Sequence, residues 1–303
     1  MKILLFGKNG QVGWELQRSL APLGELIALD FRGENNPTVD GVALQGDFSR
    51  PEALRETVQR VRPDVIVNAA AHTAVDKAES EPELARALNA TSVGVLAAEA
   101  ERIGAALVHY STDYVFDGSG TRPWLETDTP APLNVYGQTK LEGEQLVQQH
   151  CARHLIFRTS WVYAARGANF AKTMLKLGQE RDALSIINDQ HGAPTGAELL
   201  ADVTAHAIRH LMRDAACAGL YHLAAWGETT WHGYASHVLE RARQAGLPIR
   251  VAASAIQPVA TSAFPTPAQR PHNSRLDTRK LQSTFSLALP HWQTGVDRML
   301  NEI

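Results

Sequence analysis

The sequence predicts an α/β protein with a doubly wound (Rossmann) parallel sheet and a smaller C-terminal substrate-binding α/β domain. Short apolar runs alternate with helical patterns through the first half of the 303 residues, which is typical of a parallel sheet covered by helices on both faces. A turn with three regularly spaced glycines follows the first run and opens a helix. After about residue 165 this alternation stops. We therefore predict a dinucleotide-binding domain over residues 1–165, to which parts of 184–225 return, and a substrate domain over 166–303.

The elements of the first half follow from local patterns. Residues 3–6 are apolar on both faces, as a buried parallel strand requires, and Val12, Leu16 and Leu20 recur every four residues along one helix stripe. A capping box at Ser49–Glu52 with a proline at position 51 predicts a helix that runs to residue 61. A third helix is predicted over 82–103, and further strands over 26–29, 65–67, 106–110 and 155–158.

The second half is predicted to be looser. Helical patterns recur over 196–211, 231–245 and 292–300. The proline-rich stretch from 258 to 271 is too interrupted for regular structure.

Composition narrows the function classes. A net charge of −3 and a sequence pI near 6.5 carry no electrostatic footprint for nucleic acid or an anionic membrane. The apolar runs are shorter than the ~20 residues of a membrane span, and the first is too short for a secretory signal. Cys151 and Cys217 lack metal or disulfide spacing, so we expect both to be reduced and the chain to be cytoplasmic.

The glycine turn predicts a dinucleotide site. Gly7, Gly10 and Gly13 follow a buried strand and open a helix, the context in which such glycines allow a tight turn and close approach of a pyrophosphate. By chance this spacing is expected only about 0.1 times in a chain of this composition, so a purely structural turn is the weaker reading.

Residues near the ends of the next strands extend this site. Asp30 lies near the ~20-residue offset at which a carboxylate holds the adenosine ribose, which favours NADH, whereas Arg32 could receive the 2′-phosphate of NADPH; the sequence leaves the choice open. Asp47 and Phe48, after a further predicted strand, could flank the adenine. The small residues 69–71 offer the surface that close nicotinamide approach requires.

Tyr136 and Lys140 are the predicted catalytic pair. Four-residue spacing puts them on one helix face, and the ammonium is expected to lower the pKa of the phenol so that it can exchange a proton with a carbonyl oxygen. A solvated surface pair is the alternative. Thr112 ends a predicted strand at the edge where ligands bind in such sheets; we prefer it to its neighbour Ser111 as the hydroxyl that orients the substrate oxygen.

These motifs resemble the extended short-chain dehydrogenase/reductase superfamily and, within it, the dTDP-4-dehydrorhamnose reductase family, along the whole chain. The resemblance rests on the glycine turn, the segment 111–118, the Tyr136–Lys140 pair and the segment 270–275, together with 68–76, 157–163 and 192–196. It implies reduction of the 4-keto group of a dTDP-sugar by NADPH or NADH.

The resemblance also implies contacts by position. Cofactor contacts would fall on Gly10, Gln11, Val12, Asp30, Asp47, Phe48, Ala71, His72, Thr73 and Tyr110, besides the catalytic pair. Sugar contacts would fall on Thr112, Asp113, Tyr136, Lys140 and Trp161. Arg270 and Arg275 are planar donors suited to the diphosphate of a nucleotide sugar, with a solvated loop as the plainer reading.

Some members of this family form homodimers around Mg²⁺, which prefers carboxylate oxygens. Glu15, Glu198 and Glu302 match the positions that this resemblance implies, although nothing local marks a metal site and each could be a solvated helix charge.

Two alternatives stay open. An epimerase or dehydratase on the same fold would hold NAD tightly, but dehydratase relatives follow the threonine with Asp-Glu, whereas Tyr114 follows Asp113 here. A non-catalytic subunit, like the regulatory partner of methionine adenosyltransferase, would bind a dinucleotide without turnover.

Overall fold

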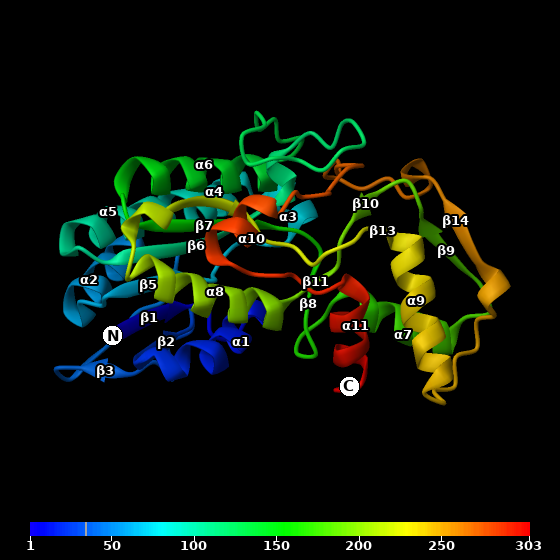
Figure 1. The fold of residues 1–303 in the computed structure, drawn as a ribbon, viewed down its shortest axis with the longest axis horizontal. Coiled ribbons are helices and arrows are strands. Elements are labelled where there is room, and N and C mark those ends of the chain that lie inside the picture. The colour runs from blue at the N-terminus through cyan, green and yellow to red at the C-terminus, as the bar shows by residue number, and fades with distance from the viewer. Residues whose placement is uncertain (34) are drawn as a thin grey trace.

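The computed structural model describes residues 1–33 and 35–303, and a six-stranded parallel sheet dominates its N-terminal part (Figure 1). The strand order is β12-β7-β6-β5-β1-β2, with every neighbouring pair parallel. The strands are β1 (Lys2–Phe6), β2 (Glu25–Leu29), β5 (Val65–Asn68), β6 (Ala106–Thr112), β7 (His154–Thr159) and β12 (Gly219–His222).

Both faces of this sheet are covered by helices, because successive side chains of a strand point to opposite faces. In β1, Ile3 and Leu5 join the core beneath α1 (Gln11–Leu20), α8 (Ala197–Leu211) and α10 (Arg279–Phe285). Leu4 and Phe6 join the core beneath α2 (Pro51–Val61), α5 (Ser92–Ile103) and α6 (Val135–His150). The predicted doubly wound sheet is therefore confirmed.

The outermost strand comes from late in the chain. After β7 the chain leaves the sheet through β8 (Val162–Tyr163), α7 (Phe170–Glu180), β9 (Leu184–Ile187), β10 (His191–Gly192) and β11 (Thr195–Gly196). It then returns along α8 and adds β12 beside β7. Residues 197–222 thus complete the sheet, while the predicted domain boundary near 165 stays a prediction.

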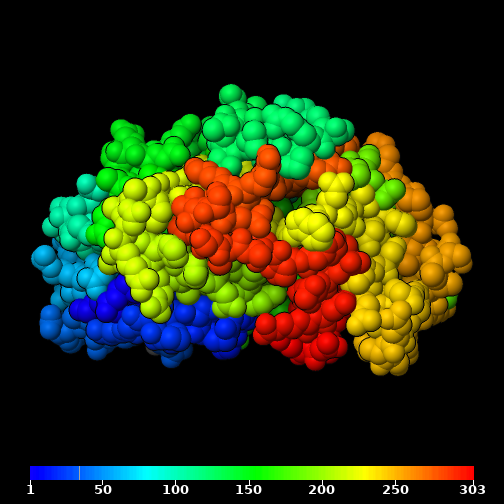
Figure 2. Space-filling view, in the orientation of Figure 1, coloured from blue at the N-terminus to red at the C-terminus, as the bar shows by residue number. Residues whose placement is uncertain are grey.

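A third cluster of buried side chains forms the core of the other end of the molecule. It lies among α7, α9 (Trp231–Gln244) and α11 (Trp292–Leu300), and includes the rings of Tyr163, Tyr234 and Trp292. Strand β9 pairs in parallel with β14 (Ile256–Val259) at the far edge (Figure 1). In the space-filling view, the last part of the chain lies across the middle of the visible face, between the two ends (Figure 2).

The remaining elements are short. They are η1 (Ala21–Leu23), β3 (Thr38–Val39), β4 (Val42–Ala43), α3 (Val75–Ser80), α4 (Pro82–Arg86), η2 (Ala87–Thr91), η3 (Asp113–Val115), η4 (Ala215–Cys217), β13 (Thr229–Thr230), η5 (Ala253–Ala255) and η6 (Thr261–Ala263). Within the described ranges, no helix is both long and apolar enough to cross a membrane.

Some local predictions were wrong. The capping box does not form: Arg50 is the N-cap residue of α2, without a side-chain cap, and the Ser49 hydroxyl donates instead to Asp47. The strand expected before Asp47 is only the hairpin strand β4, which pairs with β3 rather than with the sheet. Pro258, in the stretch predicted to be irregular, lies in β14; a two-stranded ladder leaves it an edge position, where the missing N–H is tolerated.

The helix predicted over 82–103 contains a π-helical turn, η2, between α4 and α5. Asn89 in this turn is fully buried: its amide oxygen accepts from the His72 N–H (2.8 Å) and its amide nitrogen donates to the Thr139 hydroxyl (3.1 Å). Such turns are frequent at functional sites, and this one ties the loop after β5 to α6.

Candidate functional site

The glycine turn is built to bring backbone close to backbone. Gly7 has φ +85°, and a Cβ there would lie 2.8 Å from the carbonyl carbon of Ala69. A Cβ on Gly13 would lie 2.0 Å from the Gly7 oxygen. Gly10 is the N-cap residue of α1, and a Cβ there would have the Gly7 oxygen as its nearest neighbour, at 3.4 Å. The turn and the start of α1 therefore pack tightly between β1 and β5.

This packing leaves the N-terminus of α1 open. Within the described ranges, the backbone N–H groups of Gln11, Val12 and Gly13 have no hydrogen-bond acceptor. The first N–H groups of a helix together with its dipole form a site for an anion such as phosphate. The residues present thus fit a dinucleotide, whose pyrophosphate would meet these donors.

Asp30 lies at the carboxyl end of β2 beside this turn. Its carboxylate accepts from the Asn9 amide at 2.5 Å and from the Gly33 N–H at 3.0 Å. These donors hold one carboxylate at the place where an adenosine ribose would lie. Arg32 stands two residues on, with its guanidinium 5.5 Å from the centre of the Phe31 ring. Asn9 was missed by the sequence reasoning, and only its position inside the glycine turn could have indicated it.

The other predicted cofactor residues lie nearby with different roles. Phe48 is buried and packs edge-to-face on Phe6, with ring centres 5.5 Å apart, so its ring belongs to the core. Ala71, His72 and Thr73 follow β5 at the carboxyl edge. The Tyr110 hydroxyl is occupied by Thr204 of α8 at 2.6 Å. The cofactor contacts predicted for these residues therefore stay predictions.

Thr112 and Tyr136 meet at the end of β6. Burial raises the pKa of Tyr136 to about 12, interaction with the Thr112 hydroxyl opposes that rise, and the Asp113 carboxylate adds to it. The Thr112 hydroxyl donates to Asp113 at 3.1 Å and accepts from the Tyr114 N–H at 3.2 Å. Burial raises the pKa of Asp113 to about 6, against hydrogen bonds from Ser274 and Thr112. The structure therefore joins the predicted hydroxyl and phenol.

Lys140 differs from the prediction. Its ammonium donates to the Tyr110 carbonyl at 2.6 Å and lies 3.3 Å from His109 Nε2, and it is not among the groups that act on the pKa of Tyr136. The lysine side chain reaches β6, where its ammonium contacts the Tyr110 carbonyl. The predicted lowering of the Tyr136 pKa by Lys140 is therefore wrong for this geometry.

His109 is a site residue that the sequence reasoning missed. It is fully buried, and its Nδ1 lies 3.1 Å from the Asn68 amide while its Nε2 faces Lys140. Burial, with the Lys140 charge adding to it, holds the pKa of His109 well below its ordinary value, so the ring is neutral at physiological pH. A histidine directly after three apolar residues of a buried strand was the available signal.

A buried ion pair lies behind Lys140. Arg158 of β7 donates to the two carboxylate oxygens of Glu144, one helical turn beyond Lys140, at 2.9 and 2.6 Å. Burial lowers the pKa of Lys140 to about 8, and the Glu144 charge opposes this. The pair thus anchors α6 to the sheet and sets part of the field around Lys140.

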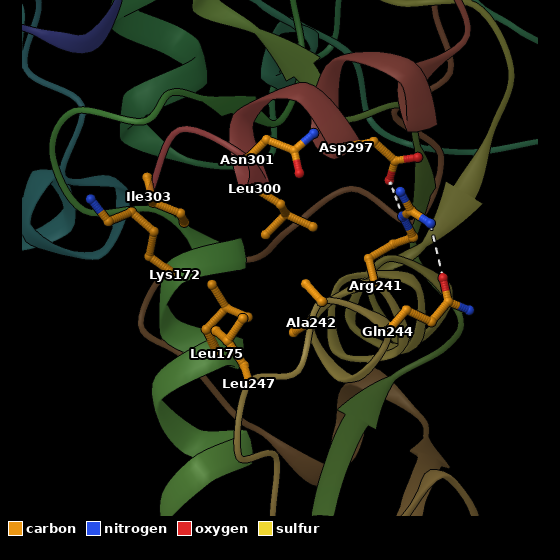
Figure 3. A pocket seen from close by; sticks show the side chains of 11 residues that line it. Lys172, Leu175, Arg241, Ala242, Gln244, Leu247, Asp297, Leu300, Asn301 and Ile303 are labelled. Atoms are coloured by element: carbon orange, nitrogen blue, oxygen red, sulfur yellow. Dashed lines mark hydrogen bonds and ion pairs between the residues drawn. The ribbon is translucent and has the colours of Figure 1, made fainter.

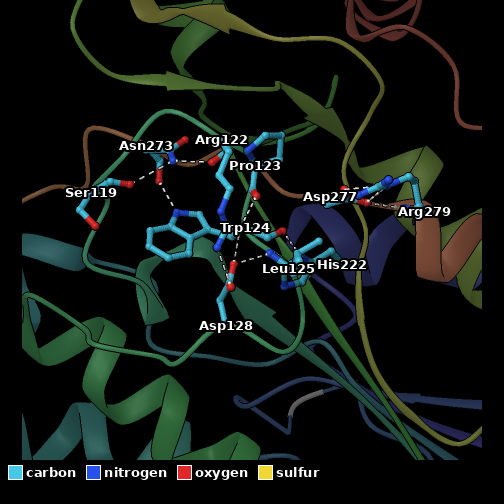
Figure 4. A network of polar contacts seen from close by, with 10 residues as sticks. All are labelled: Ser119, Arg122, Pro123, Trp124, Leu125, Asp128, His222, Asn273, Asp277 and Arg279. Atoms are coloured by element: carbon cyan, nitrogen blue, oxygen red, sulfur yellow. Dashed lines mark hydrogen bonds and ion pairs between the residues drawn. The ribbon is translucent and has the colours of Figure 1, made fainter.

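The loop between Thr112 and Tyr136 is held by a polar network (Figure 4). The Trp124 indole donates to the Asn273 carbonyl at 3.0 Å, and the Asn273 amide donates to the carbonyls of Ser119 and Arg122. His222 of β12 contacts the Trp124 carbonyl at 3.0 Å. The C-terminal segment therefore fixes the loop that connects Thr112 to Tyr136.

The predicted substrate residues lie in different surroundings: one is stacked on another ring and two are in ion pairs. Trp161 has φ +49° and stacks on Trp231 with ring centres 3.8 Å apart, which forms a flat aromatic surface. Arg270 is paired with Asp76 (2.9 Å) and Arg275 with Glu228 (2.6 Å). A diphosphate at either arginine would have to compete with these carboxylates, so their assigned role stays a prediction.

The glutamates predicted to hold Mg²⁺ do not form a metal site in one chain. Glu15 contacts Arg18 and Glu302 contacts Arg298, and no group of three ligating side chains within residues 1–33 and 35–303 is arranged around a metal position. Burial raises the pKa of Glu198, and Glu15 and Glu302 lie near enough to add to that rise.

A pocket of about 340 Å³ between α7, α9 and α11 contains none of the predicted site residues (Figure 3). Its Arg241 is already bonded to Asp297 and Gln244 (Figure 3). The predicted catalytic residue Thr112 lies elsewhere, at the carboxyl end of β6.

Comparison with known proteins identifies the family to which this chain belongs. The family description "RmlD substrate binding domain" matches residues 1–303. A dTDP-4-dehydrorhamnose reductase of Shigella flexneri is 64% identical over all of this chain and 98% of its own length. The chain belongs to the dTDP-4-dehydrorhamnose reductase family.

Solved structures of the family agree along the whole fold. A dTDP-4-dehydrorhamnose reductase of Clostridium acetobutylicum superposes with a TM-score of 0.87 at 35% identity, covering 100% of this chain and 99% of that one. The enzyme of Bacillus anthracis, in complex with NADP, gives a TM-score of 0.86 at 33% identity and covers all of both chains. The resemblance inferred from the motifs is thereby confirmed at the level of the family.

Proposed function

We propose that this chain reduces the 4-keto group of dTDP-4-dehydro-6-deoxy-L-mannose with NADPH or NADH, giving dTDP-L-rhamnose in the last step of dTDP-rhamnose biosynthesis. The observation that carries this proposal is the position of Tyr136, whose ring packs on Tyr114 with ring centres 5.6 Å apart, beside the Thr112 hydroxyl at the end of β6. The open N-terminus of α1 lies at the same carboxyl edge of the sheet. Membership of the family supports the same substrate class.

A bound nicotinamide supplies the hydride for C4 of the sugar. The chain's own contribution is the proton: Tyr136 would donate its phenolic hydrogen to the oxygen that becomes negative. A pKa of about 12 keeps the phenol protonated near neutral pH, so the acid needed for reduction is present without any lowering by Lys140. Thr112 would hold the substrate oxygen beside that proton.

Lys140 then has a different task from the one first predicted. Its ammonium is held by the Tyr110 carbonyl and faces His109, which places a positive charge beneath the site. A charge held there stabilises a developing oxyanion in a water-poor environment. His109 and Asn68 would position that lysine rather than touch the substrate.

The experiment is reduction of enzymatically generated dTDP-4-dehydrorhamnose, followed by loss of NADPH or NADH absorbance, with the product identified by chromatography. Tyr136→Phe should lower turnover by about 10²–10⁴-fold, the usual weight of a general acid, with cofactor affinity largely kept. Turnover close to that of the parent chain would refute the role of Tyr136.

The same assay separates the alternatives. An epimerase or dehydratase would form a new sugar without net consumption of reduced cofactor, and a regulatory subunit would bind cofactor without turnover.

Homodimer formation around Mg²⁺ through Glu15, Glu198 and Glu302 is a separate proposal. It is supported by the charges of Glu15 and Glu302, which both act on Glu198, and the lack of a complete ligand set among the described residues of one chain weighs against it.

A further inference from the structure

A pocket of about 370 Å³ opens beside Asp30, at the carboxyl end of β2. Its lining residues are Asn9, Asp30, Phe31, Arg32, Asn35 and Arg166. All but the last come from the first 35 residues. Arg166 comes from the loop between β8 and α7, in the half of the chain predicted to hold the substrate.

This loop, residues 165–169, is fastened to the first turns of α1. The Arg166 guanidinium lies 3.9 Å from the centre of the Trp14 ring. The Asn169 amide donates to the Gln11 side chain at 3.4 Å, and also to the Ala164 carbonyl at 2.6 Å. Gly167 has φ +80°, and a Cβ there would lie 3.4 Å from Gln11 Cγ. Stacking on an indole orients a guanidinium without neutralising it.

The charges of the pocket favour an anion despite the carboxylate. Asp30 is 7% exposed and already accepts from Asn9 and Gly33. Across residues 1–33 and 35–303, no carboxylate forms an ion pair with Arg32 or Arg166. Two guanidinium groups therefore line the pocket with one carboxylate, each of whose oxygens already accepts one hydrogen bond.

We propose that Arg166 is a specificity-determining residue of the cofactor site, which with Arg32 binds the 2′-phosphate of NADPH. This inference rests on the proposed use of a nicotinamide dinucleotide. Asp30 can accept from a free ribose hydroxyl, so NADH binds without the arginines, whereas a 2′-phosphate beside Asp30 needs two cations to offset the repulsion. Trp14 is a positioning residue that keeps Arg166 at the pocket.

The test uses adenosine 2′,5′-bisphosphate and adenosine 5′-diphosphate as probes, titrated calorimetrically into the full chain. Arg166→Ala should weaken 2′,5′-bisphosphate binding by about tenfold or more, the weight of a charge-assisted contact to phosphate, and 5′-diphosphate binding by less than about threefold. Trp14→Leu should shift the ratio of the two affinities in the same direction, and Trp14→Phe, which keeps a ring under the guanidinium, should restore it. The Arg60→Ala control removes an equal charge from the exposed last turn of α2 and should leave the ratio unchanged.

Equal losses for both probes, or no loss in Arg166→Ala, would overturn the assignment. Selective loss in Arg60→Ala would show a general charge effect and would overturn it as well. Both probes bind without sugar or turnover, so the result stands even if the proposed reductase activity fails. Circular dichroism and melting of each variant separate misfolding from a change in binding, and Arg166→Lys, which keeps the charge, should show an intermediate ratio.

Discussion

Replacing Glu144 by glutamine should destabilise the protein far more than the same change at Glu142, a half-buried residue of the same helix. Arg158 donates two hydrogen bonds to this carboxylate, at 2.9 and 2.6 Å, and the two side chains are only 4% and 1% exposed. One guanidinium nitrogen already lacks a partner, so a neutral amide would leave a buried charge uncompensated. Breaking one side of such a pair costs about 3–5 kcal/mol. The Phe116 ring, 4.9 Å from the guanidinium, recovers little of that.

Chemical denaturation with guanidinium chloride measures this loss, and at about 2–4 °C per kcal/mol the melting temperature should fall by roughly 6–20 °C. Glu142→Gln is the matched control. Glu142 lies in the same helix and pairs with Arg86, but the arginine and glutamate side chains are 44% and 26% exposed, so its loss should cost less than about 1 kcal/mol. Equal destabilisation by the two variants would refute the reasoning. Recovery in the double variant Glu144→Leu/Arg158→Met would confirm that the unpaired charge, not lost volume, is responsible.

Two further predictions follow from the same geometry. Burial lowers the pKa of Lys140 to about 8, so the ammonium is present below that pH and is lost above it, and kcat/KM for reduction should fall as pH rises through about 8. Glu144→Gln removes the charge that raises this pKa and should move the fall to lower pH. A profile that stays flat to pH 10 in both proteins would contradict this. Gly13→Ala should lower the melting temperature and abolish cofactor binding, since its Cβ would lie 2.0 Å from the Gly7 oxygen. The control Gly10→Ala, whose Cβ would lie 3.4 Å from that oxygen, should melt at the same temperature as the parent chain. Melting curves with and without NADPH measure both effects, and an unchanged melting temperature for Gly13→Ala would show that the turn can relax.

Local patterns were enough for much of the site. The glycine turn could be recognised because the close approach of Gly7 and Gly13 excludes any Cβ, which restricts the residue type at fixed spacing. Tyr136 could be recognised because helix periodicity places it at the face that meets the end of β6. Where the local signal had two outcomes, as for Ser49 as a cap or as a partner of Asp47, the pattern failed.

The sequence by itself therefore determined the class of fold, the glycine turn and the candidate for the proton donor, since each depends on residues within a few turns of one another. Only the tertiary structure decided that Lys140 faces His109 and the Tyr110 carbonyl, that Glu144 pairs with Arg158, and that Arg166 reaches the pocket beside Asp30. These contacts join segments brought together by the register of β6 with β7 and by the return of the loop after β8 to α1. Register and chain return are set by the packing of the whole core, and no local spacing encodes them.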